Sequence, residues 1–181
     1  MKTIRRCLCL ILAFAMLLLS GCHGSRGLAP FQIPDEFDTT RDYEITFWAK
    51  NDTNKTQANI YQAAIDGFQK LYPNIHVTLR LYTDYGKIYN DVITNISTNT
   101  TPNVCITYPD HIATYTSGSN CVVPLDELIC HPAFGLGGSQ IPFDSPTAEE
   151  IIPQFLEECR FDGKLFALPY MRSTEACYIN K

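Results

Sequence analysis

The chain has 181 residues, and its 14 basic and 19 acidic side chains give a formal net charge of −5. The first 21 residues contain three of the basic residues and none of the acidic ones, which leaves 11 basic against 19 acidic residues, a net charge of −8, for the remainder. A surface with this excess of negative charge repels a phosphate backbone. Nucleic acid is therefore excluded as an expected partner.

The first 21 residues have the layout of a secretory signal peptide. Three positive residues precede an apolar run, Cys7 to Leu19, that is too short to span a bilayer comfortably. The following Leu19-Ser20-Gly21-Cys22 resembles the bacterial lipobox. We interpret residues 1–21 as a lipoprotein signal peptide and expect acyl chains such as palmitate on Cys22, the alternative being a signal anchor with an incidental cysteine. Two or more acyl chains anchor stably, so the mature protein is expected on the extracytoplasmic face of the cell membrane.

Five of the eight cysteines remain once the signal peptide is removed and Cys22 is acylated: Cys105, Cys121, Cys130, Cys159 and Cys177. An extracytoplasmic location permits disulfides, but spacing does not define their pairing, and an odd number leaves at least one thiol free or paired elsewhere. The sequence has no C-x-x-C motif, and the adjacent Cys130 and His131 are poorly placed to face one zinc ion. No metal and no other cofactor is expected.

Residues 22–42 are predicted to be a linker. Gly, Ser, Pro and charged side chains dominate, and the few apolar residues show neither a helical nor a strand period. The linker would hold the following domain, residues 43–181, away from the membrane.

A βαβ unit begins at Tyr43. The residues from Tyr43 to Trp48 alternate and are rich in strand-forming types. Apolar residues then recur at steps of three and four and predict a helix that Pro73 ends: Tyr61, Ala64, Ile65, Phe68, Leu71 and Tyr72. Alternation from Ile75 to Tyr82 predicts a second strand. The crossover should be right-handed, with parallel strands and the helix on one face of the sheet.

The pattern repeats after Tyr82. Apolar residues between Ile88 and Ile96 mark a second helix, and the run from Val104 to Ile106 is typical of a buried parallel strand. Short helices are expected around residues 112–115, 126–129 and 151–156, with Asp126 capping the second of them. Residues 131–146 are rich in Gly, Pro and Ser and indicate a surface insertion, and Asp162-Gly163 predicts a hairpin. The fold class is α/β with a doubly wound, mostly parallel sheet.

Aromatic residues follow or end the three predicted strands: Trp48, Tyr82, Tyr85 and Tyr108. In doubly wound sheets, ligands bind in the crevice beyond the carboxyl ends of the strands. The last part of the chain adds Tyr170. Ring faces suit the C–H faces of sugars, and sugar hydroxyls pair with groups such as Asp110, Arg172 and Ser173. For each ring taken singly, the alternative is ordinary packing.

Six short motifs resemble, in their order and spacing, the extracellular solute-binding proteins of sugar ABC transporters. They are Phe47-Trp48, Phe68 to Ile75, Thr101 to Val104, Val123 to Asp126, Asp162 to Tyr170, and Arg172 to Glu175 with Tyr178 to Lys181. The resemblance implies a periplasmic-binding-protein-like fold, in which two α/β lobes joined by hinge strands close on a ligand. It implies that residues 43–181 are the N-terminal portion of such a domain, truncated before the second lobe.

The resemblance also implies a function and a site. Matching positions place ligand contacts at Trp48, Tyr85, Asp110 and Ser173, and Arg172 lies in the same hinge motif. The protein would capture a carbohydrate, either a sugar, an oligosaccharide or a glycerol-phosphate-like solute, and pass it to the permease subunits of an ABC transporter. It would act as a monomer and without chemistry. The last twenty residues lack a closing element, which also predicts a longer protein.

Two other functions stay open. An extracytoplasmic glycosidase needs two carboxylates across a cleft, and three acidic pairs are available: Asp126-Glu127, Glu149-Glu150 and Glu157-Glu158. Adjacent acids on a helix point in different directions, however, and the sequence has no G-x-S-x-G, P-loop or G-x-G-x-x-G motif. The other alternative, a receptor that presents its ligand to a membrane sensor, would use the same binding module. We expect a binding protein and not an enzyme.

Overall fold

The computed structural model describes residues 28–51, 55–171, 173 and 177. The predicted signal peptide, Cys22 and Arg172 lie outside the described residues. Residues 28–42, the described part of the predicted linker, contain no helix or strand. This segment is attached to the domain at Leu28, whose N–H donates to Ser119 O at 3.1 Å and whose carbonyl accepts from Asn120 at 2.7 Å. None of the helices in the described part of the chain is both long and apolar enough to cross a bilayer.

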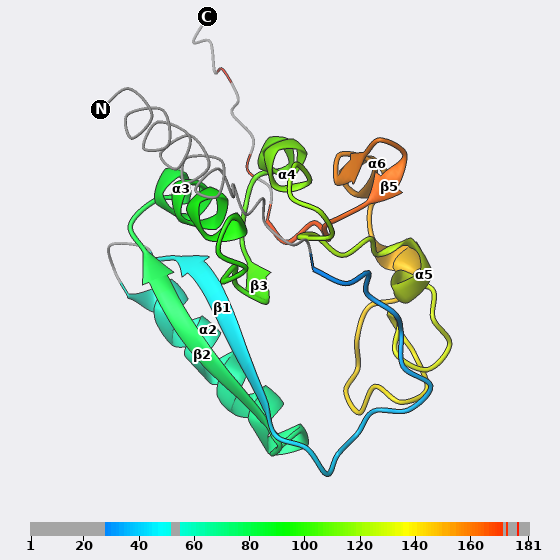
Figure 1. Cartoon of the computed structure of the whole chain (residues 1–181). Coiled ribbons are helices and arrows are strands. Elements are labelled where there is room, and N and C mark those ends of the chain that lie inside the picture. Colours follow the sequence, from blue (N-terminus) through cyan, green and yellow to red (C-terminus); the bar gives the residue numbers. More distant parts are fainter. Residues whose placement is uncertain (1–27, 52–54, 172, 174–176, 178–181) are drawn as a thin grey trace, which may run out of the picture.

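Three parallel strands form the main sheet, in the order β2-β1-β3 (Figure 1). β1 (Tyr43–Lys50) pairs with β2 (Ile75–Tyr82) along its full length, and β3 (Val104–Cys105) pairs with the last part of β1. The predicted parallel βαβ unit is confirmed. The prediction of a buried third strand is wrong, because β3 has two residues and, among the described strands, pairs only with β1, and Val104 is 53% exposed.

The two long helices cover opposite faces of this sheet. α2 (Thr56–Leu71) packs on the face of β1 that carries Phe47, whose ring meets the ring of Tyr61 edge-on at 5.6 Å. α3 (Tyr85–Ile96) packs on the other face, where its side chains join Trp48 in one core. Successive residues of a strand point to opposite faces, so Phe47 packs against α2 and Trp48 against α3. The sheet is therefore doubly wound, as predicted.

The ends of both helices follow from local sequence. α2 ends at Leu71, two residues before Pro73, which cannot continue a helix. α3 begins after Asp84, whose side chain accepts a hydrogen bond from the N–H of Lys87 at 2.8 Å. Such a cap satisfies one of the N–H groups that a helix leaves unpaired at its start.

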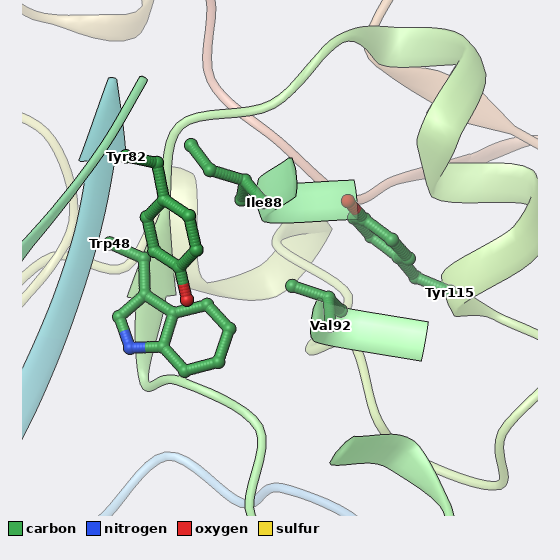
Figure 2. Packing of buried hydrophobic residues seen from close by; sticks show 5 residues of the cluster. All are labelled: Trp48, Tyr82, Ile88, Val92 and Tyr115. Carbon is green, nitrogen blue, oxygen red and sulfur yellow. The ribbon is translucent and has the colours of Figure 1, made fainter. Parts of the chain in front are cut away.

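The main core lies between the sheet and α3 (Figure 2). Its buried members come from two strands, from α3 and from α4 (Pro109–Tyr115), and they are Trp48, Tyr82, Ile88, Val92 and Tyr115. Burying a side chain of this size contributes about 1.5–3 kcal/mol. Ile88 is fully buried and therefore lies at the centre of the packing.

A second region is built from short elements. It contains α5 (Asp126–Ile129), a 3-10 turn η1 (Ala148–Glu150), α6 (Pro153–Glu157), β4 (Arg160–Phe161) and β5 (Lys164–Leu165). β4 and β5 form an antiparallel hairpin in which Asp162 and Gly163 both have positive φ, 50° and 75°. Two positive φ values in a two-residue turn match the strand twist, and the hairpin predicted at Asp162-Gly163 is confirmed. A small core of Ile129, Cys159 and Leu165 lies beneath it.

Asp126 holds this second region together instead of capping α5. The residue before the helix is Leu125, without a side-chain cap. The carboxylate of Asp126 accepts from Arg160 at 2.8 Å and from the N–H of Leu165 at 3.0 Å. The predicted cap is therefore wrong, because a buried backbone donor and a guanidinium brought in by the hairpin are stronger partners than the first turn of a four-residue helix.

Residues 131–146 form an irregular segment, as predicted for an insertion, and it contains ordered turns. After β5 the chain continues from Phe166 to Met171 without forming a strand. The N–H of Phe166 donates to Cys159 O at 3.1 Å, and Leu168, Tyr170 and Met171 are exposed.

Candidate functional site

The three parallel strands end at one edge of the sheet. β1 ends at Lys50, β2 at Tyr82 and β3 at Cys105, and the loops that follow lead into α2, α3 and α4. Helix N-termini and strand carboxyl ends therefore converge at this edge, which is where open α/β sheets bind ligands. The buried Oδ1 of Asn51, directly after β1, has no hydrogen-bond partner among the described residues.

Two tyrosines from different loops meet at this edge, and we call Tyr85 and Tyr108 the aromatic rim. Tyr85 is the first residue of α3 and Tyr108 precedes α4. Their ring centroids are 4.7 Å apart and the rings are tilted by 50°. The ammonium of Lys50, at the end of β1, lies 5.7 Å from the Tyr85 ring centroid. Tyr108 is 50% exposed, so the rim presents aromatic surface to solvent.

His111 packs against the rim residue Tyr108. Its ring lies 4.3 Å from the ring of Tyr89 and meets Tyr108 edge-on at 5.4 Å. Its Nδ1 is 3.1 Å from the hydroxyl of Thr107, which is also 3.1 Å from the hydroxyl of Tyr115. Burial raises the pKa of Tyr115 to about 12, so this phenol stays neutral and available for hydrogen bonding. The network orders the segment between β3 and α4 that carries Tyr108.

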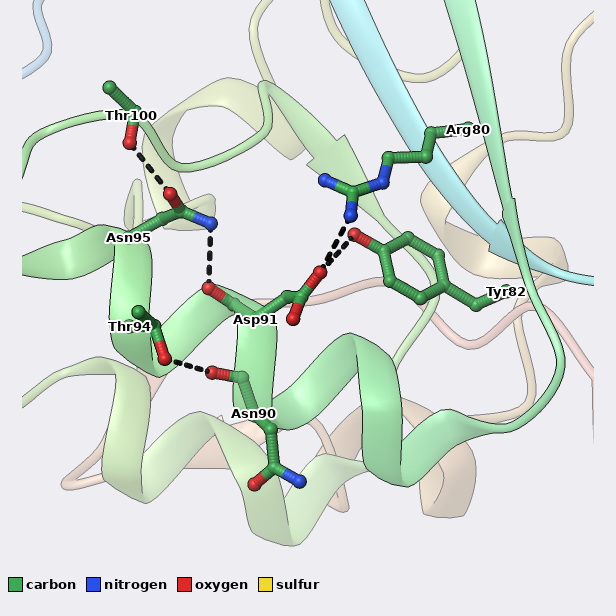
Figure 3. Close-up of polar contacts among 7 residues, drawn as sticks. All are labelled: Arg80, Tyr82, Asn90, Asp91, Thr94, Asn95 and Thr100. Carbon is green, nitrogen blue, oxygen red and sulfur yellow. Dashed lines mark hydrogen bonds and ion pairs between the residues drawn. The ribbon is translucent and has the colours of Figure 1, made fainter.

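Trp48 and Tyr82 were predicted to stand at the rim, but the structure places both in the core. Trp48 is 5% exposed and its ring contacts that of Tyr82 at 5.4 Å. Arg80 lies over both rings, at 4.8 and 4.7 Å. Asp91 of α3 accepts from Arg80 at 2.8 Å and from the Tyr82 hydroxyl at 2.9 Å (Figure 3). The expectation is corrected because both rings point to the α3 face of the sheet and not beyond its edge.

The remaining predicted contacts that the structure describes are Asp110 and Ser173. Asp110 is exposed in the first turn of α4, two residues after Tyr108. Ser173 is exposed, and Arg172 lies outside the described residues. Of the five predicted ligand contacts, Tyr85 therefore lies at the open edge of the sheet. Asp110 lies two residues after the rim residue Tyr108, and Trp48 lies in the core. Their roles in binding stay predictions.

The last described segment returns to the same edge. The ring of Tyr170 lies 6.4 Å from that of Tyr61, in the second turn of α2. The side-chain amide of Gln57, also near the start of α2, contacts the sulfur of Met171 at 3.7 Å. Tyr170 and Met171 are 57% and 50% exposed. This segment therefore adds a second aromatic and apolar surface beside the loop that leaves β1.

Sequence reasoning missed Lys50, Met171 and His111. Lys50 is the last residue of β1, and a strand two residues longer than the predicted one would have placed it at the edge. His111 lies three residues after Tyr108 in a helical turn, a spacing that brings side chains together. Nothing in the local sequence of Met171 signals its contact with Gln57, 114 residues away.

The chemistry of the edge is that of a binding surface. It offers tilted aromatic rings, phenol hydroxyls and an ammonium group. The described part of the chain holds no group of three or more His, Cys, Asp or Glu side chains arranged for a metal ion. Rings with polar tips bind molecules that have both apolar faces and hydroxyl groups.

Two solved solute-binding structures share this fold. An extracellular solute-binding protein of family 1 from Alicyclobacillus acidocaldarius subsp. acidocaldarius DSM 446 matches 71% of the chain and 28% of its own length, with a TM-score of 0.52 and 21% identity. The GacH receptor of Streptomyces glaucescens GLA.O, solved unliganded and in complex with acarbose and an acarbose homolog, matches 71% of the chain and 29% of its own length, with a TM-score of 0.53 and 25% identity. The chain thus spans less than a third of the length of either neighbour.

A third neighbour is described as a de novo designed cysteine esterase, ECH19, and matches 68% of the chain and 26% of its own length, with a TM-score of 0.51 and 18% identity. A likeness at that identity shows the fold alone. Comparisons with protein-family models and with curated proteins found no match. The described part of this chain has the fold of the extracellular solute-binding proteins of family 1.

Proposed function

We propose that this chain belongs to an extracytoplasmic solute-binding protein that captures a carbohydrate for uptake by an ABC transporter. The observation that carries the proposal is the aromatic rim, the half-buried ring of Tyr85 and the exposed ring of Tyr108, which meet at the carboxyl edge of a sheet with this fold. The structural likeness to a receptor solved with acarbose supports a carbohydrate as the ligand class.

The rim suits a neutral sugar. A pyranose presents C–H groups on its faces, which pack on tyrosine rings, and hydroxyls at its edge, which need donors and acceptors. The Tyr85 and Tyr108 hydroxyls and the exposed Asp110 lie at the starts of α3 and α4, at this edge. The buried Oδ1 of Asn51, without a hydrogen-bond partner among the described residues, lies directly after β1. Affinity then comes from stacking and hydrogen bonds, because an acidic chain offers little general attraction to an anion.

In this proposal the ligand lies between two lobes. The rim and the segment from Leu168 to Met171 form one wall of the cleft, and a second lobe forms the other. The ligand prefers the closed arrangement, and the permease recognises closure. Acylation of Cys22 keeps the protein at the outer face of the membrane near the permease. A receptor that serves a membrane sensor would use the same closure and differs only in its partner.

The acidic residues that a glycosidase would need have structural roles where the structure shows their contacts. Asp126 is bound by Arg160 and by the N–H of Leu165. Glu150 accepts from the N–H of Thr147 at 2.7 Å and from its hydroxyl at 3.1 Å, and so caps η1. Burial raises the pKa of the Cys105 thiol to about 11, which keeps it protonated and a weak nucleophile. These contacts favour binding over catalysis.

The test is calorimetric titration and thermal shift of the mature protein with a panel of neutral oligosaccharides and phosphate esters. A bound sugar should raise the melting temperature. Tyr85→Ala and Tyr108→Ala should each weaken affinity about tenfold, because each removes one stacking surface. Phe161→Ala is the matched control, since it removes an exposed ring of the β4–β5 hairpin, which carries none of the predicted ligand contacts, and should leave affinity unchanged.

Two results would contradict the proposal. One is the absence of any thermal shift across the panel together with cleavage of a glycoside by the same protein. The other is a sugar affinity that the two rim substitutions leave unchanged, which would place the ligand elsewhere. Loss of ligand uptake in cells that lack the protein would separate transport from sensing.

A further inference from the structure

The insertion after α5 begins with a single helical turn, His131-Pro132-Ala133-Phe134-Gly135. The N–H of Gly135 donates to the carbonyl of His131 at 2.8 Å and closes the turn. The ring of His131 folds back over the turn, and its Nδ1 accepts from the N–H groups of Ala133 at 3.3 Å and Phe134 at 3.2 Å. The imidazole therefore caps the turn, as an Asn or Ser side chain usually does at a helix start.

The sequence around His131 is suited to this geometry. Pro132 occupies the first position of the turn, where its ring is tolerated and no N–H is needed. A Cβ at Gly135 would lie 2.6 Å from the backbone of His131 and 2.7 Å from Leu128 O, so this position requires glycine. The Phe134 ring stacks on the His131 ring at 5.4 Å and 10°, which holds the imidazole in place.

The two hydrogen bonds define the protonation state of the ring. Backbone N–H groups can only donate, so Nδ1 must be without a proton and the neutral ring must carry its proton on Nε2. A second proton would place an N–H directly against two other N–H groups. We propose that His131 is a proton-sensitive cap: the neutral ring, with its proton on Nε2, orders the loop, and a second proton on Nδ1 breaks both hydrogen bonds and releases it.

No nearby carboxylate would compensate the added charge. The titratable groups of the surrounding elements are Asp126, Glu127 and Cys130 at α5, Asp144 in the loop, and Glu149 and Glu150 in η1, and Asp126 is already paired with Arg160. In the part of the chain that the structure describes, no ion pair joins His131 to any carboxylate. Glu150 is already bound by Thr147. Protonation therefore loses two hydrogen bonds and gains no ion pair there.

Loss of the His131 cap would also affect the packing of the small core of Ile129, Cys159 and Leu165. The N–H groups of Ser139 and Gln140 donate to Pro132 O at 2.9 Å and Ala133 O at 3.0 Å, so the following loop depends on the turn. Leu136 bonds to Ile129 O at 3.1 Å and packs against the cluster that contains Leu165. Leu165 directly precedes the segment that ends at the edge of the sheet. Acid would thus loosen the loop first and then the support of that segment.

His111 provides an internal contrast. Its Nδ1 faces the hydroxyl of Thr107, and a hydroxyl can either donate or accept. Protonation of His111 can therefore be accommodated by rotating one O–H group. Protonation of His131 cannot, because its partners are backbone amides.

The experiment measures amide hydrogen exchange of the whole chain at pH 7.5 and pH 5.5, corrected for intrinsic rates. Protection of the Ala133 and Phe134 amides should fall about tenfold at the lower pH, as expected for the loss of one or two hydrogen bonds. His131→Asn is the matched variant, since its carboxamide oxygen replaces Nδ1 as an acceptor and does not titrate. It should keep the protection and lose the pH dependence, whereas His111→Asn should behave like the unaltered chain.

Protection of these amides that is equal at both pH values would overturn the proposal, and so would an unchanged pH dependence in His131→Asn. If that variant is unprotected at both pH values, the imidazole ¹⁵N shifts of the unaltered chain are decisive. A neutral ring with its proton on Nε2 at pH 7.5 that gains the second proton as protection falls supports the cap. A neutral ring protonated on Nδ1 refutes it.

Discussion

The sheet region, residues 43–115, and the hairpin region, residues 125–167, are stabilised in different ways. Five buried side chains, three of them aromatic, form the core of the sheet region (Figure 2). The hairpin region buries only Ile129, Cys159 and Leu165, and the carboxylate of Asp126 ties its elements together. Apolar burial involves no titrating group, whereas charge-assisted hydrogen bonds depend on pH and are screened by salt. The hairpin region should therefore respond to pH more strongly than the sheet region, where the Arg80–Asp91 pair lies beside a larger apolar core.

The two regions also differ in the length of their elements. In the sheet region, two strands and two helices have eight or more residues each, and each of them follows one hydrophobic period. In the hairpin region, elements of two to five residues meet through single contacts, such as Asp126 with Arg160. Figure 1 shows these short elements beside the sheet, with the long loop of residues 131–146 below α5. Because single contacts join these elements, each polar residue contributes a larger share of the stability of the hairpin region.

The largest expected effect is that of Ile88→Ala. Ile88 is fully buried among the rings of the main core, so its truncation leaves a cavity and should lower the free energy of unfolding by about 3–4 kcal/mol. Leu165→Ala, at the other fully buried position, should cost about 2–3 kcal/mol, because a smaller cluster can collapse into the space. Urea denaturation measures both. A larger loss for Leu165→Ala would show that the hairpin region is the better packed of the two.

Gly118→Ala should cost about 1–3 kcal/mol. Gly118 lies just after α4, and an added Cβ would overlap the sulfur of Cys121 and lie 2.6 Å from Cγ2 of Ile96. The overpacking should appear as a lower melting temperature. The double variant Gly118→Ala/Cys121→Ala should recover part of the loss. Full stability of the single variant would show that the side chains of Cys121 and Ile96 shift at little cost.

Asp126→Asn should cost about 1 kcal/mol at neutral pH, because the pair is partly exposed and solvent screens it. The hydrogen bond from Arg160 is the main cause that lowers the pKa of Asp126. Its stabilisation is therefore complete above the ordinary carboxyl pKa of about 4 and is lost as the pH falls through the lower folded value.

Urea unfolding at pH 7 and pH 3 tests this pH dependence. The stability difference between the unaltered chain and Asp126→Asn should be present at pH 7 and reduced at pH 3. Ile88→Ala serves as the control, with a loss that should be the same at both values. A difference for Asp126→Asn that grows in acid would contradict the assignment of the ion pair.

The smallest effect expected is a gain. Gly67 lies inside α2, and a Cβ there would meet no atom within 4 Å, so Gly67→Ala should stabilise by about 0.5–1 kcal/mol. Gly86→Ala in α3 is the control, since its Cβ would lie 3.2 Å from the capping oxygen of Asp84. Its gain should be smaller or absent. Thermal unfolding resolves the two, and an equal gain would show that the Asp84 cap adjusts freely.

Much of the fold was predictable because it follows from local patterns. The bounds of β2 agree with the alternation from Ile75 to Tyr82, and Pro73 predicted the end of α2. The two positive φ values at Asp162 and Gly163 follow from the residues themselves. Each of these features depends on neighbours a few residues apart, and the sequence contains that information.

The candidate site was only partly predictable. The convergence of loops at the strand ends, with Tyr85 and Tyr108 among them, follows from the order of elements. The burial of Trp48 and Tyr82 does not, because it depends on which face of the sheet α3 covers at those positions. The contact between Gln57 and Met171 joins residues 114 apart and has no local signal.

The sequence by itself determined the α/β class, the succession of strands and helices, the hairpin turn and the placement of aromatic residues beside strand ends. Its periodicity does this because regular backbone geometry sets which residues share a face. Only the tertiary structure showed which rings are exposed, that Asp126 binds the hairpin instead of capping α5, and that His131 caps its own loop. These depend on long-range packing and on competition among hydrogen-bond partners, which a local pattern does not encode.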